Sequence, residues 1–399
     1  MKIAVWISFN YAPKVGGSFS YADKLIKSID EYCFSKDLDI CFATTQYTHI
    51  GNLRREVIRI GHPLEAIVAK IPFLANYRKF QGLMWRFFSH NYNKYLKRDG
   101  IKFLFYSSQF ERFVKDFPFV APHWDIAYRS TFAFPEFSII LQDIRDKYYS
   151  YVLPRALMIF AESEAGKKEL IRYTNINEER IKVVPLFAGE CTRFSLTEQQ
   201  QSDILKRHGL EKGKYFFYPA QFIAEKNHYN VVKAFSCFIK NHPDYKLIFT
   251  GNSPKSLLGT IDYVRSSVEQ LGLLGKVVFG GFVPLETIYS LYKNACALIM
   301  ASYVGPTNMP PLEAMSLGCP VICSDLSGHR EEMRDSALYF DAKDYSQLLE
   351  AMEEMTNNRD MYLNKIIERS KVCEFTVESA LKRINDYLLE ASVIRRAWE

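Results

Sequence analysis

The 399-residue sequence lacks any apolar run long enough to cross a bilayer. Its first apolar run, residues 2–8, is short and leads into Pro13 and a glycine pair, which predicts a first strand rather than a signal peptide. We therefore expect a cytoplasmic protein. The length and a hydrophobic content of 48% favour two globular domains, each with its own core.

Paired cysteines, acidic clusters and strong net charge are also missing. The eight cysteines are scattered, and the spacing of Cys319 and Cys323 does not fit a zinc pair, so we interpret them as free thiols of a reducing compartment. Asp37 and Asp39 precede a predicted strand and are better explained as a solvated turn than as a metal site, so we expect no divalent metal. A net charge of +6 is too small to indicate nucleic acid by itself.

The most informative stretch is residues 302–328. The apolar run before it, residues 295–301, has the length of a buried parallel strand, and a loop follows that leads to Pro310 and Pro311. Two prolines are typical of a first helical turn. We therefore expect a helix over residues 312–317, which Gly318 ends, and then a second strand.

This strand, loop and helix would form an anion site. The backbone amides of Thr307, Asn308 and Met309 and the positive end of the helix dipole would face one point, which favours a phosphate. Glu313 lies about one turn inside the helix, where its carboxylate can accept hydrogen bonds from two ribose hydroxyls. The alternative is that Glu313 only complements the helix dipole.

A second glycine loop follows the first predicted strand. Gly16 and Gly17 open a predicted helix and permit close approach of the backbone, which would suit a phosphate or sugar oxygens, although a glycine pair is also typical of a plain turn. A dinucleotide fingerprint would need a third glycine, and residues 19–21 supply none.

Residues 70–102 interleave basic and aromatic side chains. At helical spacing Lys79, Arg86 and Lys97 fall on one face, and the aromatic residues lie elsewhere. One interpretation is a domain helix with a solvated basic side. The other is docking on an anionic membrane surface. Nucleic-acid binding would use the same charges, but no base-reading motif accompanies them.

The string PPLEAMSLGCPVICSDLSGHREEMRDSALYF is similar to the signature of the family 4 (group 1) retaining glycosyltransferases. The resemblance implies an α/β fold called GT-B, in which two Rossmann-like doubly wound parallel-sheet domains face a central cleft. It also implies a nucleotide-sugar donor and no metal or other cofactor. We expect an acceptor-side domain at residues 1–196, a linker at 197–212, a nucleotide-sugar domain at 213–380, and a helix at 381–399 that crosses back to the first domain.

The resemblance also implies roles for single residues. Family members have two glutamates eight positions apart, of which the first touches the transferred sugar and the second holds the ribose. Here Gly305 stands at the first position and Glu313 at the second. Lys226 matches a lysine that neutralises the leaving diphosphate, and Gln221 stands where arginine is usual.

Three further positions follow from the resemblance. We place Gly251, at the end of a predicted strand, and the backbone of Val283 in the donor site. Residues 137–143 are predicted to form a strand ending in Gln142 and Asp143, where relatives commonly have His-Asp. A glutamine there can bind a hydroxyl but cannot become a cation.

The Gln-Asp pair resembles bacterial O-antigen and capsule mannosyl- or rhamnosyltransferases. This implies transfer of a hexose, with GDP-mannose as first guess, to a lipid-linked oligosaccharide at the inner face of the cell membrane. Two alternatives stay open. A nucleotide-sugar epimerase can share the fold, and a catalytically inactive partner would bind the donor without turning it over.

Overall fold

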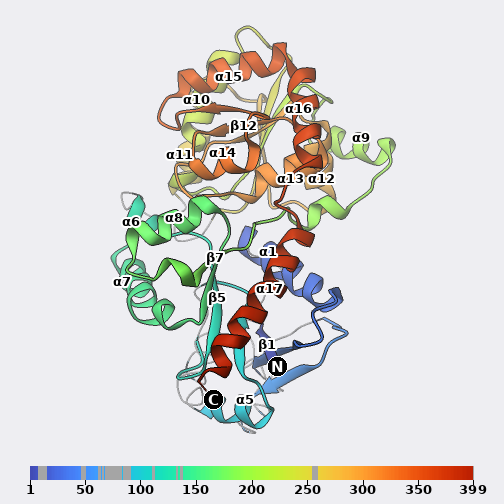
Figure 1. Ribbon diagram of the computed structural model, residues 1–399. Helices are drawn as coiled ribbons and strands as arrows, with labels where there is room; N and C mark the ends of the chain where they lie inside the picture. The colour runs from blue at the N-terminus through green and yellow to red at the C-terminus, as the bar shows by residue number, and fades with distance from the viewer. Residues whose placement is uncertain are drawn as a thin grey trace.

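The computed structural model describes residues 1–7, 16–45, 51–61, 64, 67, 83, 91–109, 113–131, 134, 138–253 and 259–398. Within these residues the chain forms two parallel β-sheets, each flanked by helices, which lie one beyond the other along the molecule (Figure 1). No helix of the described part is both long and apolar enough to span a bilayer.

The first sheet has seven strands in the order β3-β2-β1-β4-β5-β6-β7, all paired in parallel. Nearly all of its strand residues are buried, as expected of a parallel sheet covered on both faces. Its strands are β1 Lys2–Trp6, β2 Asp39–Thr45, β3 Val57–Ile60, β4 Phe103–Tyr106, β5 Phe119–His123, β6 Met158–Ala161 and β7 Ile181–Val183. Its helices are α1 Gly16–Glu31, α5 Tyr92–Arg98, α6 Ala127–Ser130, α7 Ile139–Lys147 and α8 Glu164–Tyr173.

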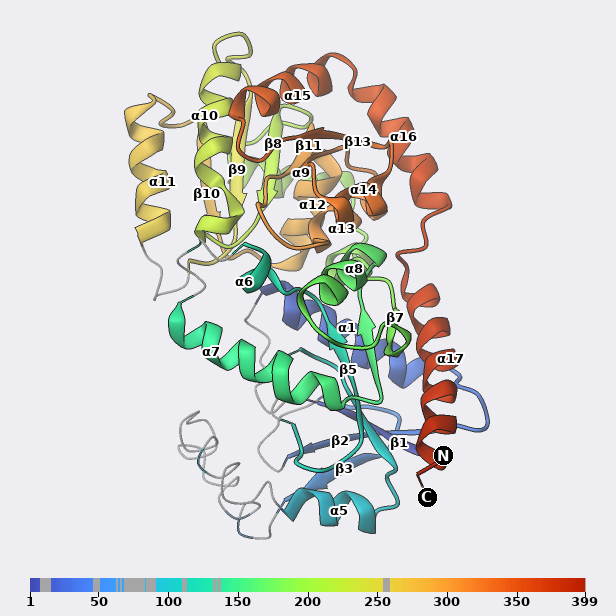
Figure 2. The same ribbon diagram turned by 60° about the vertical axis from the view of Figure 1, so that its left-hand side comes forward.

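The second sheet has six parallel strands in the order β10-β9-β8-β11-β12-β13. The strand order reverses between β8 and β11, so helices cover both faces: α10 contacts α11 and α15, and α12 contacts α9 and α13 (Figure 2). The strands are β8 Tyr215–Pro219, β9 Lys246–Thr250, β10 Val277–Gly281, β11 Ala297–Met300, β12 Val321–Ser324 and β13 Ala337–Phe340. The helices are α9 Glu198–Arg207, α10 His228–Phe238, α11 Gly259–Gln270, α12 Leu285–Asn294, α13 Met309–Leu317, α14 Ser327–Met333, α15 Tyr345–Asn357 and α16 Arg359–Lys371.

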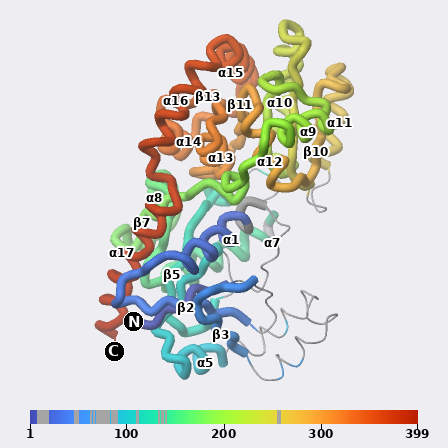
Figure 3. The backbone as a smooth tube through the Cα atoms, turned by 90° about the vertical axis from the view of Figure 1, so that its right-hand side faces the viewer, coloured from blue at the N-terminus to red at the C-terminus, as the bar shows by residue number. Residues whose placement is uncertain are grey.

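Helix α17, Val377–Arg396, returns from the second domain and lies along the first (Figure 3). Contacts along its length hold it there. Arg383 donates to the carbonyl of Val183 over 3.3 Å, Glu390 pairs with Lys182 at 2.8 Å, and Asn385 accepts from the amide of Ser35 at 2.9 Å. The crossing helix that we expected at residues 381–399 is therefore present and begins slightly earlier.

The predicted linker at residues 197–212 contains helix α9 instead of an irregular connection. Thr197 and Gln200 form a capping box, in which each side chain bonds the other's backbone, and this explains why a polar stretch is helical. Asn294 of α12 donates to Gln201 over 2.9 Å, so α9 belongs to the second domain. The chain crosses between the sheets earlier, at residues 184–197, a segment that we call the crossing peptide.

The strand expected at residues 137–143 is wrong. Ser138 accepts a hydrogen bond from the amide of Leu141 and caps α7, so Gln142 and Asp143 lie inside a helix. The apolar residues 139–141 favour a buried strand in the sequence, whereas in the structure they form the first turn of helix α7. The strand that precedes α6 and α7 is β5, which ends at His123.

Candidate donor site between the two domains

The site is built where α14 and the loop before α13 meet the first domain. Glu331 of α14 accepts hydrogen bonds from the amides of Glu164 and Ala165, both at 2.9 Å, and so caps helix α8 of the other domain. Thr307 donates to Glu162 at the end of β6 over 3.4 Å. In open parallel sheets ligands bind outside the carboxyl ends of the strands, and the ends of β11 and β12 supply these loops.

The predicted anion loop has the expected backbone. Helix α13 begins at Met309 with prolines in its first turn, and Gly318 ends it in a left-handed conformation with φ of 69°. Gly305 has φ of 97°, a conformation that favours glycine. The glycine at this position therefore suits the turn of the loop.

Two residues that we did not predict hold this loop in place. His329 bonds the carbonyl of Ser324 through Nδ1 at 2.8 Å and accepts from the side-chain amide of Asn308 at Nε2 over 2.9 Å. Burial lowers the pKa of His329 to about 4, so the ring is a neutral acceptor at physiological pH. Any Cβ at Gly328 would overlap the carbonyl oxygen of Pro306. In the sequence, the string Ser327, Gly328 and His329 at the start of α14 is the pattern from which these two residues could have been found.

Lys226 reaches the same loop from the second domain's first crossover. It ends the short 3-10 turn Ala224–Lys226 before α10, and its Nζ lies 3.2 Å from Ser302 Oγ and 3.1 Å from the carboxylate of Glu225. Ser302 follows β11. Lys226 therefore lies beside the start of this loop, and its pairing with Glu225 was not predicted.

Gly251 and Gln221 also come together. Gly251 has φ of 137°, and a Cβ there would overlap the carbonyl of Ala220. Gln221 follows β8 and is half-buried, and Val283 follows β10 and is half-buried as well. These residues follow the strands at the same edge of the sheet as Lys226.

Glu313 faces the crossing peptide. Its Oε2 accepts from the hydroxyl of Tyr292 at 2.9 Å, and a Cβ at Gly189 would overlap its Oε1. Burial raises the pKa of this carboxyl, and the hydrogen bond from Tyr292 opposes that shift. Glu313 is thus a half-buried acceptor at the junction of the two domains.

Two carboxyl groups beside the anion loop were missed by the sequence. Glu162 and Glu332 are buried, and burial raises the pKa of each well above its usual range. Glu162 adds to the shift of Glu332, whereas the amide of Asn308 opposes it. Both groups are therefore favoured in the protonated form, which suits their place next to a loop proposed to hold an anion.

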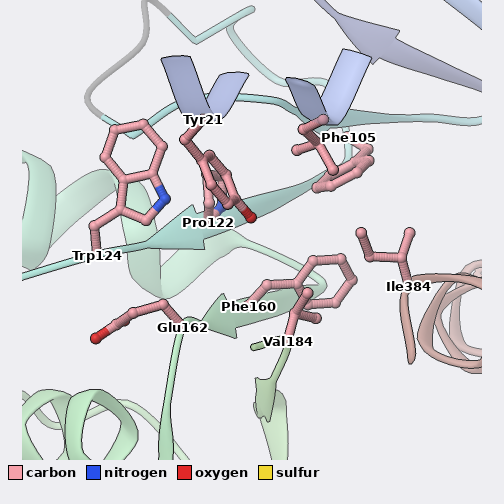
Figure 4. A pocket seen from close by; sticks show the side chains of 9 residues that line it. Tyr21, Phe105, Pro122, Trp124, Phe160, Glu162, Val184 and Ile384 are labelled. Atoms are coloured by element: carbon pink, nitrogen blue, oxygen red, sulfur yellow. The ribbon is translucent and has the colours of Figure 1, made fainter. Parts of the chain in front are cut away.

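The first domain contributes a small pocket whose lining is apolar except for Glu162 (Figure 4). Tyr21 of α1 stacks on Phe187 of the crossing peptide at 4.7 Å and meets Trp124 edge to face at 5.6 Å. Such a lining suits core packing rather than a sugar. His123 ends β5, and burial lowers its pKa to about 3.

The remaining predicted residues are dispersed. Gly16 and Gly17 begin α1, as expected. Lys97 is exposed in α5, which lies at the end of the first domain far from the second (Figure 2). Lys79 and Arg86 lie outside the described residues. No group of three or more His, Cys, Asp and Glu in the described part of the chain could hold a metal ion.

Two parallel-sheet domains joined in this way, with the loops of one facing the other, define the GT-B class of fold. Residues 200–372 match the family model of glycosyl transferases group 1, so the second domain is a domain of that family. The match begins within α9, in agreement with the assignment of that helix to the second domain.

Glycosyltransferases of known sequence are similar to part of this chain. An uncharacterized glycosyltransferase of Methanocaldococcus jannaschii is 27% identical over 177 residues, 43% of each chain. The O-antigen chain mannosyltransferase B of Escherichia coli is 27% identical over 194 residues, 48% of this chain and 49% of that protein. The matches thus span less than half of these two relatives.

Among solved structures, HepE of Anabaena in complex with UDP and glucose has a TM-score of 0.70 at 16% identity. The comparison covers 98% of this chain and all of that one. At this identity the likeness concerns the fold, and it extends over both domains.

Proposed function

We propose that the chain is a glycosyltransferase that moves a hexose from a nucleotide-diphosphate sugar to a lipid-linked surface oligosaccharide. The single observation that carries the proposal is the convergence of Lys226, the loop at residues 302–309 and Glu313 in a domain of the group 1 glycosyl transferase family. A cation and a helix amino terminus suit a diphosphate, and the half-buried carboxyl group of Glu313 suits the hydroxyls of a ribose.

The chemistry follows from these positions. In the proposed complex the diphosphate lies between Lys226 and the amino terminus of α13, with the amides of Thr307 and Met309 as donors. The charge that develops on the leaving diphosphate is stabilised by fixed groups, so no metal is needed. Gln221 and the loop at Gly16 and Gly17 complete the site, and the base lies against the backbone near Val283 and Gly251.

The acceptor hydroxyl attacks on the face that the diphosphate leaves, which retains the anomeric configuration. The buried Glu162 and Glu332 are favoured in the protonated form, which does not suit the carboxylate nucleophile of a double displacement. Gln142 remains a proposed contact of the transferred sugar, although its place in α7 gives no added support. GDP-mannose is the first candidate donor because the relatives include an O-antigen mannosyltransferase.

We further propose peripheral association with the membrane. Lys94, Lys97 and Arg98 are exposed on α5, and Lys79 and Arg86 precede them in the same basic segment. Basic residues near an anionic surface each contribute about 1 kcal/mol. Since α5 lies far from the second domain, this contact would leave the donor site accessible.

The test is a thermal-shift panel of nucleotide sugars in chelator, with each free nucleotide alongside. A donor at a hundred times its Kd stabilises the fold by about 2.7 kcal/mol, which a melting curve resolves. The donor that stabilises is then incubated with a lipid-linked acceptor on anionic vesicles, and release of free nucleotide is measured. Release that depends on the acceptor supports the proposal. Conversion of the sugar without an acceptor indicates an epimerase, and binding without turnover indicates an inactive partner.

A further inference from the structure

Helix α1 carries a buried lysine that reaches the crossing peptide. Lys24 is only 6% exposed. Its Nζ donates hydrogen bonds to the carbonyl oxygens of Ala188, at 2.6 Å, and Gly189, at 3.2 Å. A cation is costly to bury without partners. These two hydrogen bonds therefore fix the crossing peptide to the first domain.

The other side of the same peptide lies against Glu313. A Cβ at Gly189 would overlap Glu313 Oε1 and would come within 3.0 Å of the Met309 methyl carbon. The crossing peptide thus forms a wall between the lysine of α1 and the carboxylate of α13, and a shift of this wall would move the carboxylate.

Charge connects the two groups as well. Burial lowers the pKa of Lys24, and the carboxylates of Glu190 and Glu313 oppose that shift. Arg193 lowers the same pKa further, and Cys191 lies beside both groups. Lys24 thus faces the carboxyl groups of Glu190 and Glu313, whose negative charge favours its protonated form. Tyr292 of α12 supplies the remaining polar group that faces Glu313.

We propose that Lys24 is a positioning residue for the donor ribose: it holds the crossing peptide against Glu313, and its positive charge favours the ionised, hydrogen-bond-accepting form of that carboxyl group. The inference rests on the proposed function, because Glu313 must bind the ribose. Lys24 does not itself touch the donor. It links a helix of the first domain to the ribose site of the second, so that the arrangement of the domains and recognition of the ribose share one set of contacts.

Three variants of the full chain separate the effects. Lys24→Met removes both the hydrogen bonds and the charge, whereas Lys24→Gln removes the charge and keeps an N–H donor on a side chain that is one bond shorter. Lys27→Met is the matched control on the same helix, because Lys27 is exposed and pairs only with Asp23 across 2.6 Å in the described structure. Glu313→Gln provides a background in which the carboxylate cannot ionise.

The measurement is calorimetric binding of GDP and UDP, each beside its 2′-deoxy form, from pH 6 to pH 8.5. We expect the wild type to prefer the ribonucleotide and Lys24→Met to lose that preference by roughly tenfold, equivalent to about 1.4 kcal/mol. Loss of the positive charge raises the pKa of Glu313 further, so in Lys24→Gln the preference should fall at a higher pH than in the wild type. Neither change is expected in Lys27→Met, and Lys24→Gln should have no pH effect in the Glu313→Gln background.

An unchanged preference and pH profile in both Lys24 variants would overturn this inference while leaving nucleotide binding intact. If Lys24→Met does not fold, Lys24→Gln decides the matter through its pH profile. A wild type that binds neither GDP nor UDP overturns the proposed function and this inference with it. A wild type that binds one of them with no preference for ribose overturns the role of Glu313 alone, and the inference falls with that role.

Discussion

Replacement of Lys226 by alanine is the most direct test of the leaving-group site. A hydrogen bond to a charged group contributes about 1.5 to 3 kcal/mol, so loss of the ammonium should lower kcat/KM by roughly 10- to 150-fold. The side chain lies among Ser302 and Glu225 and is mostly buried, which favours the upper part of that range because solvent screens it little.

Glu225 complicates the size of the effect. Its carboxylate is 3.1 Å from Lys226 Nζ and is also mostly buried, so Lys226→Ala would leave this negative charge beside the incoming diphosphate. The double variant Glu225→Gln/Lys226→Ala removes the repulsion and should recover part of the loss. The double variant compared with Glu225→Gln alone measures the contribution of the ammonium without the neighbouring carboxylate. The extra loss in Lys226→Ala compared with the wild type measures the repulsion.

The assay is nucleotide release under single-turnover conditions, together with the Kd of the donor. Lys233→Ala is the control, because Lys233 lies on α10 close by in the chain and stacks on Tyr345 at 4.1 Å. Its turnover should equal that of the wild type. Unchanged turnover and unchanged donor affinity in both Lys226 variants would remove Lys226 from the mechanism and refute the diphosphate site built around it.

Three further predictions test the other parts of the site. Glu313→Gln should raise the KM of the donor by about tenfold and leave that of the acceptor unchanged, because a ribose contact is lost; an effect confined to the acceptor refutes the ribose role. Gly328→Ala should lower unfolding stability by about 1 to 3 kcal/mol in denaturant and weaken donor binding, because its Cβ meets the Pro306 carbonyl, whereas Gly51→Ala has open space and should do neither. Glu332→Gln should raise the melting temperature relative to the wild type, and this increase should be larger at pH 8 than at pH 5. In the wild type the carboxyl group of Glu332 has its ordinary pKa in the unfolded chain and a higher pKa in the fold. The wild type therefore loses stability as the pH rises between these two pKa values. A difference that is constant with pH would mean that Glu332 is ionised in the fold.

The local pattern was enough to predict the elements around the anion loop. The apolar run before Ser302, the proline pair and Gly318 each act over a few residues, and the structure has a strand, a helix start and a helix end at these places. The family signature added the two-domain fold, because it is read from a string that spans several elements. Lys226 was found in the same way, as the match to a lysine of the family.

The sequence failed where a residue's role depends on a partner far along the chain. The apolar run in residues 137–143 is compatible with a strand or with a helix, and from the sequence we predict a strand. In the structure the side chain of Ser138 caps a helix at this place. Lys24 reads as an ordinary lysine on an amphipathic helix. Its burial follows only from the crossing peptide, which lies more than 160 residues away.

The crossing peptide explains why these missed residues gather in one place. A connection that passes between two domains exposes its carbonyls to both, and buried carbonyls need donors. Lys24 supplies them from the first domain, while Glu313 packs on the opposite side without a covering side chain at Gly189. A small residue is therefore required at that position, and replacement of Gly189 by alanine should displace Glu313 and weaken the ribonucleotide more than its 2′-deoxy form. Equal weakening of the ribonucleotide and its 2′-deoxy form would show that the crossing peptide affects the diphosphate site and not the ribose site.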